Sequence, residues 1–333
     1  MLALGFLGTA IFILALSYAP NVPQIALYYA ASSLFSSAVG VSTSFILVKS
    51  SSKLRLNESY SMLNFINSLG YLVGDVSAAV LSGFMDVKSI LLIMGLLPMV
   101  SSVWSLVSVP RITNGSGKAM ERLLPGGRGG LKVSLGELVT LYLALIIFYV
   151  SSGIFNTLYP YGLRVGGLSR TWVMTIISVG MGGIQIVGFM ITPRMIKVLG
   201  GNARASSRAL LLRGLVVLSN WFNFINPPET MIITGLTLYP LAAGIAFSTF
   251  YTASSVIVFE RLSSGEEGRG LGAYNFITGS AYLAGSLASG YLADSIGIGR
   301  SYMVAGAMLW ASSYLFEQIR RYEAARNSVI NAN

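Results

Sequence analysis

The sequence contains neither cysteine nor histidine, and only 10% of its 333 residues are charged. Without cysteine, the chain has no disulfides, no thiolate metal ligands and no cysteine nucleophile. Without histidine, it lacks the side chain that titrates nearest to neutral pH and most often binds metals. Charged residues make up roughly 25% of an ordinary soluble domain, so this chain has too few to cover a surface in water. We therefore expect neither a metal site nor a cofactor.

Apolar residues are abundant instead, at 54% of the chain, and the mean hydropathy is +0.70. Ten apolar segments follow one another, most of them near the ~20 residues that a helix needs to cross a bilayer. They run over 1–19, 24–48, 60–84, 89–109, 137–159, 171–192, 208–223, 230–258, 268–292 and 299–316. Most are too long for strands and lack two-residue alternation. The sequence therefore predicts an all-α, polytopic membrane helix bundle.

Basic residues orient these spans. Eighteen of the 22 Lys and Arg residues lie in one set of alternate loops and in the C-terminal tail. Cytoplasmic loops of membrane proteins carry an excess of Lys and Arg. We therefore expect a protein of the plasma membrane with both termini in the cytoplasm. Arg208 and Arg213, at the start of the span 208–223, are counted on that side, and no basic residue is expected to be buried midway through a span. The scattering of the charges between spans argues against a nucleic-acid partner.

Two segments of the chain repeat each other. Asn64-Phe65-Ile66 and Tyr71-Leu72-Val73-Gly74 recur as Asn275-Phe276-Ile277 and Tyr282-Leu283-Ala284-Gly285, at a constant offset of 211 residues. Both copies lie in spans that run outward after a basic loop. Parallel repeats about an axis along the membrane normal are an architecture of transporters. The repeat predicts two pseudo-symmetric helical halves.

With this layout, the sequence resembles the major facilitator superfamily. The basic linker 110–136 is similar to the cytoplasmic loop between that family's two halves, and Arg269-Gly270-Leu271-Gly272 resembles the opening of its eleventh helix. The resemblance implies a truncated N-terminal half at 1–109 (family helices 3–6), a six-helix C-terminal half at 137–316 and a cytoplasmic tail at 317–333. The segment from Pro193 to Gly200 resembles the loop between helices 8 and 9, but lacks its Asp and its paired Arg residues.

The N-terminus departs from the family pattern. Met1 falls where the third family helix would begin, so the resemblance implies that the first two helices are missing. We expect either a mis-assigned start or a truncated gene product. Residues 1–16 could also be the apolar core of a signal peptide, but no Lys or Arg precedes Lys49 to form the basic region that such a peptide needs.

Polar groups inside lipid are costly and are expected to face the protein interior or a water-filled path. Asn64, Ser68, Tyr71 and Asp75 have the spacing of one helical face. Asp75 is the only acidic residue well inside a predicted span. Because burial favours the protonated form of a carboxyl group, Asp75 is the candidate for proton coupling. The alternatives are a hydrogen bond between helices and a solvated position near the outer surface.

Amides and phenols in the spans are the candidates for solute binding. They are Asn64, Tyr71, Asn156, Gln185, Asn275 and Tyr282. Such neutral groups suit uncharged or amphipathic solutes, and without a basic residue midway through a span a strongly anionic solute is disfavoured. Hydrogen bonding between helices is the alternative for these side chains. The glycine clusters at 70–74 and 180–188 favour close helix packing over flexing.

These observations favour a secondary active transporter, working as a monomer, that moves a small neutral or amphipathic solute by alternating access. Its expected partners are the solute, protons and membrane lipid. A truncated membrane protein that acts as a scaffold or sensor is the alternative. We expect no enzymatic activity, because Asp75, Asp86 and Asp294 are not paired as metal-diphosphate chemistry in membranes requires.

Overall fold

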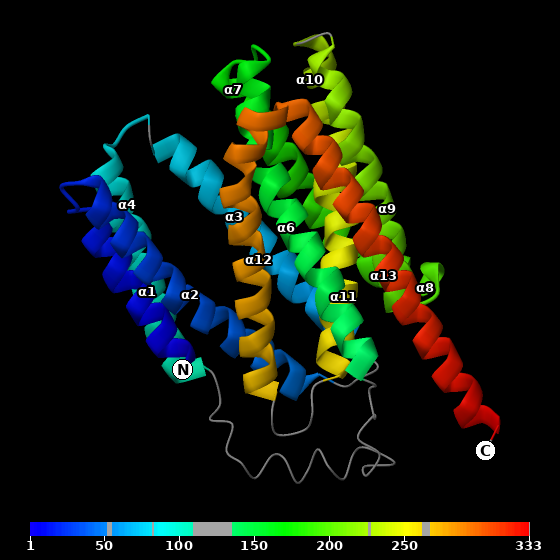
Figure 1. Cartoon of the computed structure of the whole chain (residues 1–333). Helices are drawn as coiled ribbons and strands as arrows, with labels where there is room; N and C mark the ends of the chain where they lie inside the picture. Colours follow the sequence, from blue (N-terminus) through cyan, green and yellow to red (C-terminus); the bar gives the residue numbers. More distant parts are fainter. Residues whose placement is uncertain (52–54, 82, 109–134, 226–227, 262–266, 333) are drawn as a thin grey trace. The chain divides into compact units, whose positions relative to one another are not determined.

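The computed structural model describes residues 1–333 except 52–54, 82, 109–134, 226–227, 262–266 and 333 (Figure 1). In the described part every regular element is helical and no strand occurs, which confirms the all-α prediction. The linker expected at 110–136 lies almost entirely outside the described residues.

Each of the ten predicted spans coincides with one helical rod in the described part of the chain. Eight rods are single α-helices: α1 (Leu2–Leu16), α2 (Val22–Ser50), α3 (Leu56–Leu81), α4 (Val87–Ser108), α6 (Leu135–Val165), α9 (Asn202–Ser219), α12 (Glu267–Ile296) and α13 (Ile298–Ala332). Two are composite: α7 (Arg170–Ile177) continues through η2 (Ser178–Ile184) into α8 (Gln185–Leu199), and α10 (Glu229–Pro240) continues through η4 (Leu241–Ala246) into α11 (Phe247–Glu260). A short 3₁₀ turn, η3 (Asn220–Phe224), extends α9. Helices form here because a backbone in lipid must satisfy its own hydrogen bonds.

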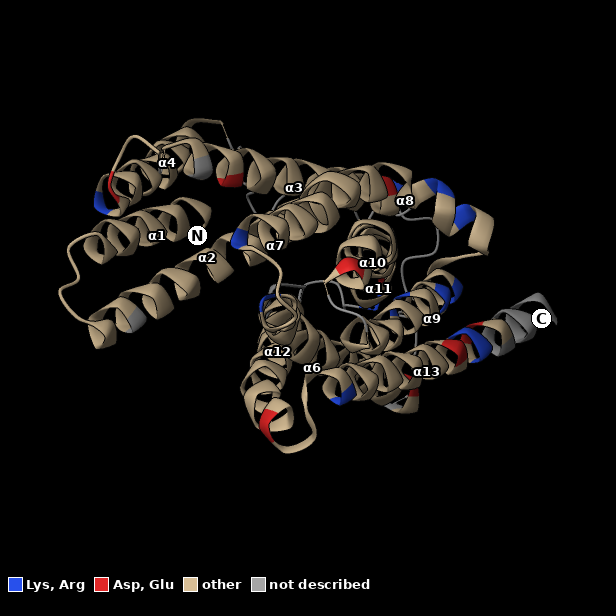
Figure 2. Ribbon diagram, turned by 90° about the horizontal axis from the view of Figure 1, so that it is seen from above, with Lys and Arg blue, Asp and Glu red and all other residues tan. Residues whose placement is uncertain are grey.

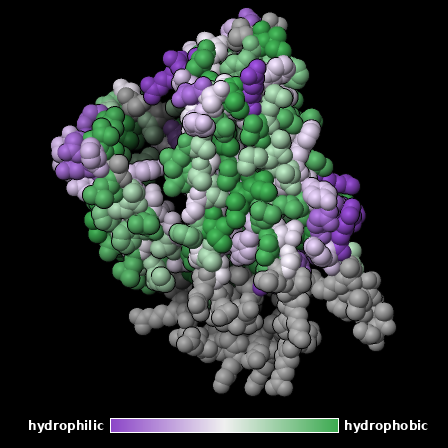
Figure 3. All heavy atoms as spheres, viewed as in Figure 1, coloured by the Kyte–Doolittle hydropathy of each residue, from purple (hydrophilic) through white to green (hydrophobic). Residues whose placement is uncertain are grey.

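In the part of the chain that the structure describes, five helical stretches are both long and apolar enough to cross a membrane. They are Val22–Val48, Val87–Ser108, Gly136–Val165, Arg170–Leu199 and Glu229–Glu260. The sides of other helices are apolar as well: α12 exposes Phe276, Leu287 and Tyr291 by about three quarters each. Figure 3 shows such hydrophobic residues over much of the visible faces of α6, α12 and α13. The five other predicted spans stay predictions.

The chain divides into two compact units. Unit 1 comprises Met1–Ser50, Gly74–Lys132 and Ser263–Asn275, and unit 2 comprises Ser51–Val73, Val133–Leu262 and Phe276–Asn333. Both α3 and α12 are therefore shared between the units. The predicted halves, 1–109 and 137–316, rest on sequence symmetry and stay a prediction.

In unit 1, α1 packs against α2 and α4 through glycines. A Cβ atom on Gly8 would lie 2.2 Å from the ring of Phe35 in α2, and one on Gly95 of α4 would lie 2.7 Å from Leu14. The hydroxyl of Ser102 donates to the carbonyl of Ala3 over 2.8 Å. Small residues allow this close approach, which in lipid replaces the hydrophobic effect as the source of helix association.

In unit 2, α13 packs against α6 and α9, and α6 crosses α12. At the α6–α12 crossing, a Cβ on Gly153 would lie 2.2 Å from the carbonyl oxygen of Tyr282, and one on Gly285 would lie 2.1 Å from that of Val150. Buried serines donate to the carbonyls of neighbouring helices, as Ser151 does to Ala305 over 2.7 Å. Unit 2 is therefore stabilised by close packing of helix backbones at glycines and by hydrogen bonds from serine side chains to backbone carbonyls.

The two composite rods widen into π-helix at η2 and η4, and these segments contact each other. Pro240 directly precedes η4 and has no N–H to donate to the preceding turn, which gives a reason for the wider turn there. A Cβ on Gly180 would lie 2.5 Å from the ring of Tyr239, and one on Gly188 would lie 2.9 Å from the carbonyl oxygen of Gly244. The prediction of close packing for the cluster at 180–188 is confirmed at these positions. At Gly70 and Gly74 no described atom lies within 4 Å of such a Cβ.

Candidate solute-binding site

The four polar residues predicted to share a face of α3 have different surroundings. Asn64 is buried, and its amide donates to the carbonyl of Tyr60 in its own helix over 2.9 Å. Ser68 is also buried, whereas Tyr71 is 76% exposed. Asp75 is exposed and, among the described residues, has no hydrogen bond or ion pair. The described residues therefore do not supply the burial that the coupling hypothesis expects, and the role of Asp75 stays a prediction.

The other four candidates lie on α6, α8 and α12. Asn156 on α6 and Gln185 at the start of α8 are partly buried, and within the described ranges neither makes a hydrogen bond through its side chain. Both amides are thus available to a ligand. Tyr282 on α12 is 37% exposed, and Asn275, about two turns earlier on the same helix, is exposed.

One basic residue lies in an unexpected place. Gly200 and Gly201 have φ of +85° and +106°, so α8 ends and α9 begins within these two residues. Because α9 starts at Asn202, Arg213 lies about 16 Å along the helix at 1.5 Å per residue. Its side chain is buried, with the residue only 4% exposed. The expectation that Arg213 belongs to the cytoplasmic loop, and that no basic residue is buried midway through a span, is wrong.

The reason for this error is local. The apolar run begins at 208, whereas the helix begins six residues earlier, in the polar segment that follows the two glycines. Gly200-Gly201 was the available signal, since paired glycines often end a helix. Figure 2 shows the remaining Lys and Arg residues of this region near the end of α8 and the start of α9.

Two aromatic rings contact the guanidinium of Arg213. Its central carbon lies 5.5 Å from the ring centre of Phe148 on α6 and 5.2 Å from that of Phe247 on α11. Each cation–π contact stabilises by ~0.5–2 kcal/mol. No described residue accepts a hydrogen bond from Arg213 or pairs with its charge. Its five N–H donors thus lack an acceptor among the residues that the structure describes. Burying a charge without a counter-ion costs several kcal/mol of free energy, and the two cation–π contacts do not offset this cost in full.

An aromatic row extends from this position along α11. Phe247 stacks on Tyr251 with ring centres 5.4 Å apart, Tyr251 stacks on Tyr60 of α3 at 5.9 Å, and Phe259 meets the edge of Tyr60 at 5.1 Å. Phe247 and Tyr251 are partly exposed, whereas Tyr60 and Phe259 are buried. We call these four residues the aromatic row. The partly exposed members offer flat apolar surface beside the buried cation.

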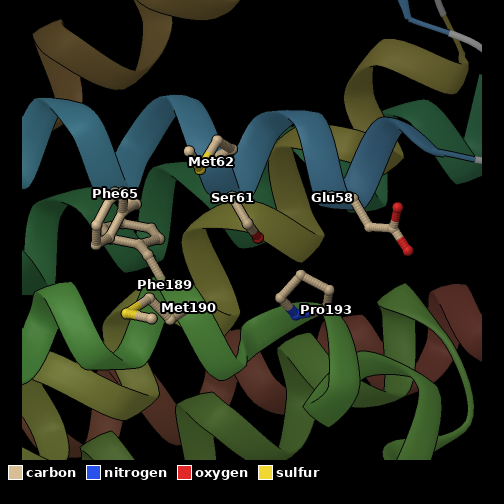
Figure 4. A pocket seen from close by; sticks show the side chains of 7 residues that line it. All are labelled: Glu58, Ser61, Met62, Phe65, Phe189, Met190 and Pro193. Atoms are coloured by element: carbon tan, nitrogen blue, oxygen red, sulfur yellow. The ribbon is translucent and has the colours of Figure 1, made fainter.

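A cavity of about 240 Å³ lies between α3 and α8 within unit 2 (Figure 4). It is lined by Glu58, Ser61, Met62, Phe65, Phe189, Met190 and Pro193. At its rim, Lys197 pairs with Glu58 over 3.4 Å, but both side chains are more than half exposed, and such pairs contribute at most about 1 kcal/mol. The hydroxyl of Ser61 is buried and has no partner among the described residues. Sequence reasoning missed this cavity because no period or motif links α3 with α8.

The sequence matches the profile of the Major Facilitator Superfamily over residues 1–286. No curated protein matches it. Among solved structures, the fold is similar to the human organic anion transporter MFSD10 (TETRAN), with 17% identity, a TM-score of 0.70, and coverage of 95% of this chain and 76% of that one. It is also similar to the proton:xylose symporter XylE bound to 6-bromo-6-deoxy-D-glucose, with 12% identity, a TM-score of 0.67, and coverage of 95% and 78%.

At these identities the two structures establish the fold alone. The family match covers most of the chain, and it agrees with the helical rods and the apolar spans described above. This chain is a multi-pass membrane protein that belongs to the major facilitator superfamily.

Proposed function

We propose that this chain is a secondary active transporter that moves a small organic solute across the plasma membrane by alternating access, with both termini in the cytoplasm. The match to the Major Facilitator Superfamily over residues 1–286 carries the proposal. The amides of Asn156 and Gln185, which make no hydrogen bond to the described protein, and the partly exposed members of the aromatic row support it, because polar groups inside a membrane bundle commonly mark a substrate path.

The proposed coupling is to protons, through Asp75. Its support is the position of a lone carboxyl group within a predicted span, since intramembrane acidic residues commonly relay protons. The symporter XylE uses protons, but that property belongs to XylE. The second candidate function is that of a scaffold or sensor that does not transport.

The experiment is solute uptake into proteoliposomes that contain the purified chain. The probes are radiolabelled D-xylose and a set of aromatic carboxylates with their neutral amides, which cover the chemistry of the two similar structures and of the candidate residues. We expect saturable uptake that is accelerated by unlabelled solute on the opposite side. If no probe enters faster than into protein-free liposomes while the protein still binds one of them, the scaffold or sensor function is favoured.

A further inference from the structure

Arg213 is a buried, charged side chain of the described C-terminal helices, and packing alone does not explain its charge. In the described part of unit 2, Glu58, Glu137, Glu229, Glu260 and Asp294 lie near helix ends. Glu317 and Glu323 lie within α13, where Glu317 pairs with Arg320 and Glu323 pairs with Arg261. Glu137, at the start of the same helix as Phe148, is about 16 Å along that helix from it and is bonded to Arg261. No carboxylate of unit 2 therefore serves as the counter-ion of Arg213.

The groups around the guanidinium lead from the buried charge to the surface of unit 2. Phe148 is fully buried, but Phe247 on the other side of the cation is partly exposed. Three phenols, those of Tyr149, Tyr239 and Tyr282, lie within electrostatic range of Arg213. Tyr149 is partly exposed and Tyr282 is 37% exposed. The charge thus lies beneath a rim of partly exposed aromatic residues.

A planar cation with free N–H donors binds carboxylate and similar oxyanions through paired hydrogen bonds. The aromatic row beside it would receive a flat apolar body, because rings stack or meet edge to face at the separations found there. One buried cation balances one negative charge. These features together select an organic monoanion that carries an aromatic or similarly flat group.

We propose that Arg213 is the anion-binding residue of the solute site and that the transported solute is an organic monoanion with a flat apolar body. This inference rests on the proposed transport function and replaces the sequence-based expectation of a neutral solute. Asn156 and Gln185 would then bind polar groups elsewhere on the solute.

The test compares carboxylates with their neutral amides at constant ionic strength. Binding of benzoate, naphthoate and indole-3-acetate to the purified full chain is measured by calorimetry against benzamide, naphthamide and indole-3-acetamide. We expect at least one carboxylate to bind about tenfold or more tightly than its amide, as hydrogen bonds to a charged group imply. Equal affinity within every pair, or no carboxylate binding, would overturn the proposal.

Variants then assign the preference to Arg213. Arg213→Gln should remove it, and Arg213→Lys should keep part of it, because Lys retains the charge without the planar fork. Arg208→Gln is the matched control, since it removes the same charge from an exposed position near the start of α9 and should leave the preference unchanged. If Arg213→Gln does not fold, the wild-type comparison and Arg213→Lys still decide the matter. An unchanged preference in Arg213→Lys together with a lost preference in Arg208→Gln would also overturn the assignment.

Uptake measurements distinguish the proposed anion site from the proposed transport function on which it rests. Amide binding with uptake of neutral solutes would leave the transporter function standing and reject the anion site. Carboxylate preference without any uptake would support the anion site and reject the transporter function.

Discussion

The guanidinium of Arg261, at the end of α11, donates from Nε to the carboxylate of Glu137, at the start of α6, over 3.0 Å, although 124 residues separate them. A second guanidinium nitrogen also bonds Glu137 and reaches Glu323 of α13 over 2.9 Å. The side chains of Arg261 and Glu137 are both 5% exposed. Three segments predicted to lie on the cytoplasmic side thus meet in one buried ion network.

Removing one charge from this network should destabilise the protein. Glu137→Gln leaves Glu323 as the one carboxylate among the described residues that pairs with Arg261. We expect a loss of about 2–3 kcal/mol in the free energy of unfolding, slightly below the range typical of a broken buried pair because Glu323 remains. Glu317→Gln is the control: its pair with Arg320 is about one third exposed, and its loss should cost less than about 1 kcal/mol. Unfolding in detergent, followed by tryptophan fluorescence, measures both. Equal losses would contradict the special role of the buried network.

The end of α13 should be sensitive to acid. Glu317 accepts a hydrogen bond from Nε of Arg320 over 2.7 Å, and this bond holds the pKa of Glu317 below its ordinary value of 4.5. A carboxyl group with a lowered pKa in the folded state stabilises it above the ordinary pKa, and this stabilisation is lost as the pH falls through the lowered one. Solvent exposure keeps the contribution below about 1 kcal/mol.

Hydrogen exchange of the segment after Glu317 checks this. Its protection, corrected for the intrinsic exchange rate, should fall when the pH is lowered from neutral to below 4.5. In Glu317→Gln it should be lower at neutral pH and change little with pH. The same pH dependence in both proteins would assign the effect to another group.

The α6–α12 crossing should tolerate no side chain at its glycines. In Gly285→Ala the new Cβ would lie 2.1 Å from the backbone oxygen of Val150, which cannot rotate away. The helices must separate, and we expect a loss of about 1–3 kcal/mol in the free energy of unfolding. Gly290→Ala on the same helix meets no described atom within 4 Å and should be neutral or stabilising by up to about 1 kcal/mol. Thermal unfolding of the two variants side by side gives the comparison.

Asp75 is tested by separating accumulation from exchange. If it couples transport to protons, Asp75→Asn should lose uptake driven by an imposed pH gradient and keep counterflow, which needs no net proton movement. Asp86→Asn removes an exposed carboxylate just before α4 and should retain both activities. Wild-type accumulation in Asp75→Asn would reject the coupling role.

The positions of the helices could be predicted because they depend on local composition. Each of the ten apolar segments coincides with a helical rod, since any long apolar run in lipid must satisfy its own backbone hydrogen bonds. The predicted boundaries differ from the observed ones where polar residues belong to a helix, as at Asn202–Ser207 of α9. Because α9 begins six residues before the predicted span, Arg213 lies inside the helix bundle and not in a loop. This position is the reason for proposing an anionic solute in place of a neutral one.

The solute-binding role of the candidate residues stays a prediction, and only part of their surroundings could be read from the sequence. Asn156 and Gln185 make no side-chain hydrogen bond to the described protein, whereas Asn64 bonds its own helix and Tyr71 is largely exposed. A helical period gives the direction of a side chain relative to its own helix, but not what the neighbouring helix presents to it.

By itself, the sequence determined a membrane-spanning all-α chain, because apolar length and the scarcity of charge act residue by residue. Only the tertiary structure decided that Arg213 would be enclosed by Phe148 and Phe247, and that Glu137 would meet Arg261 and Glu323. Those contacts join helices far apart in the chain, and their energies depend on packing and burial, which no local pattern encodes.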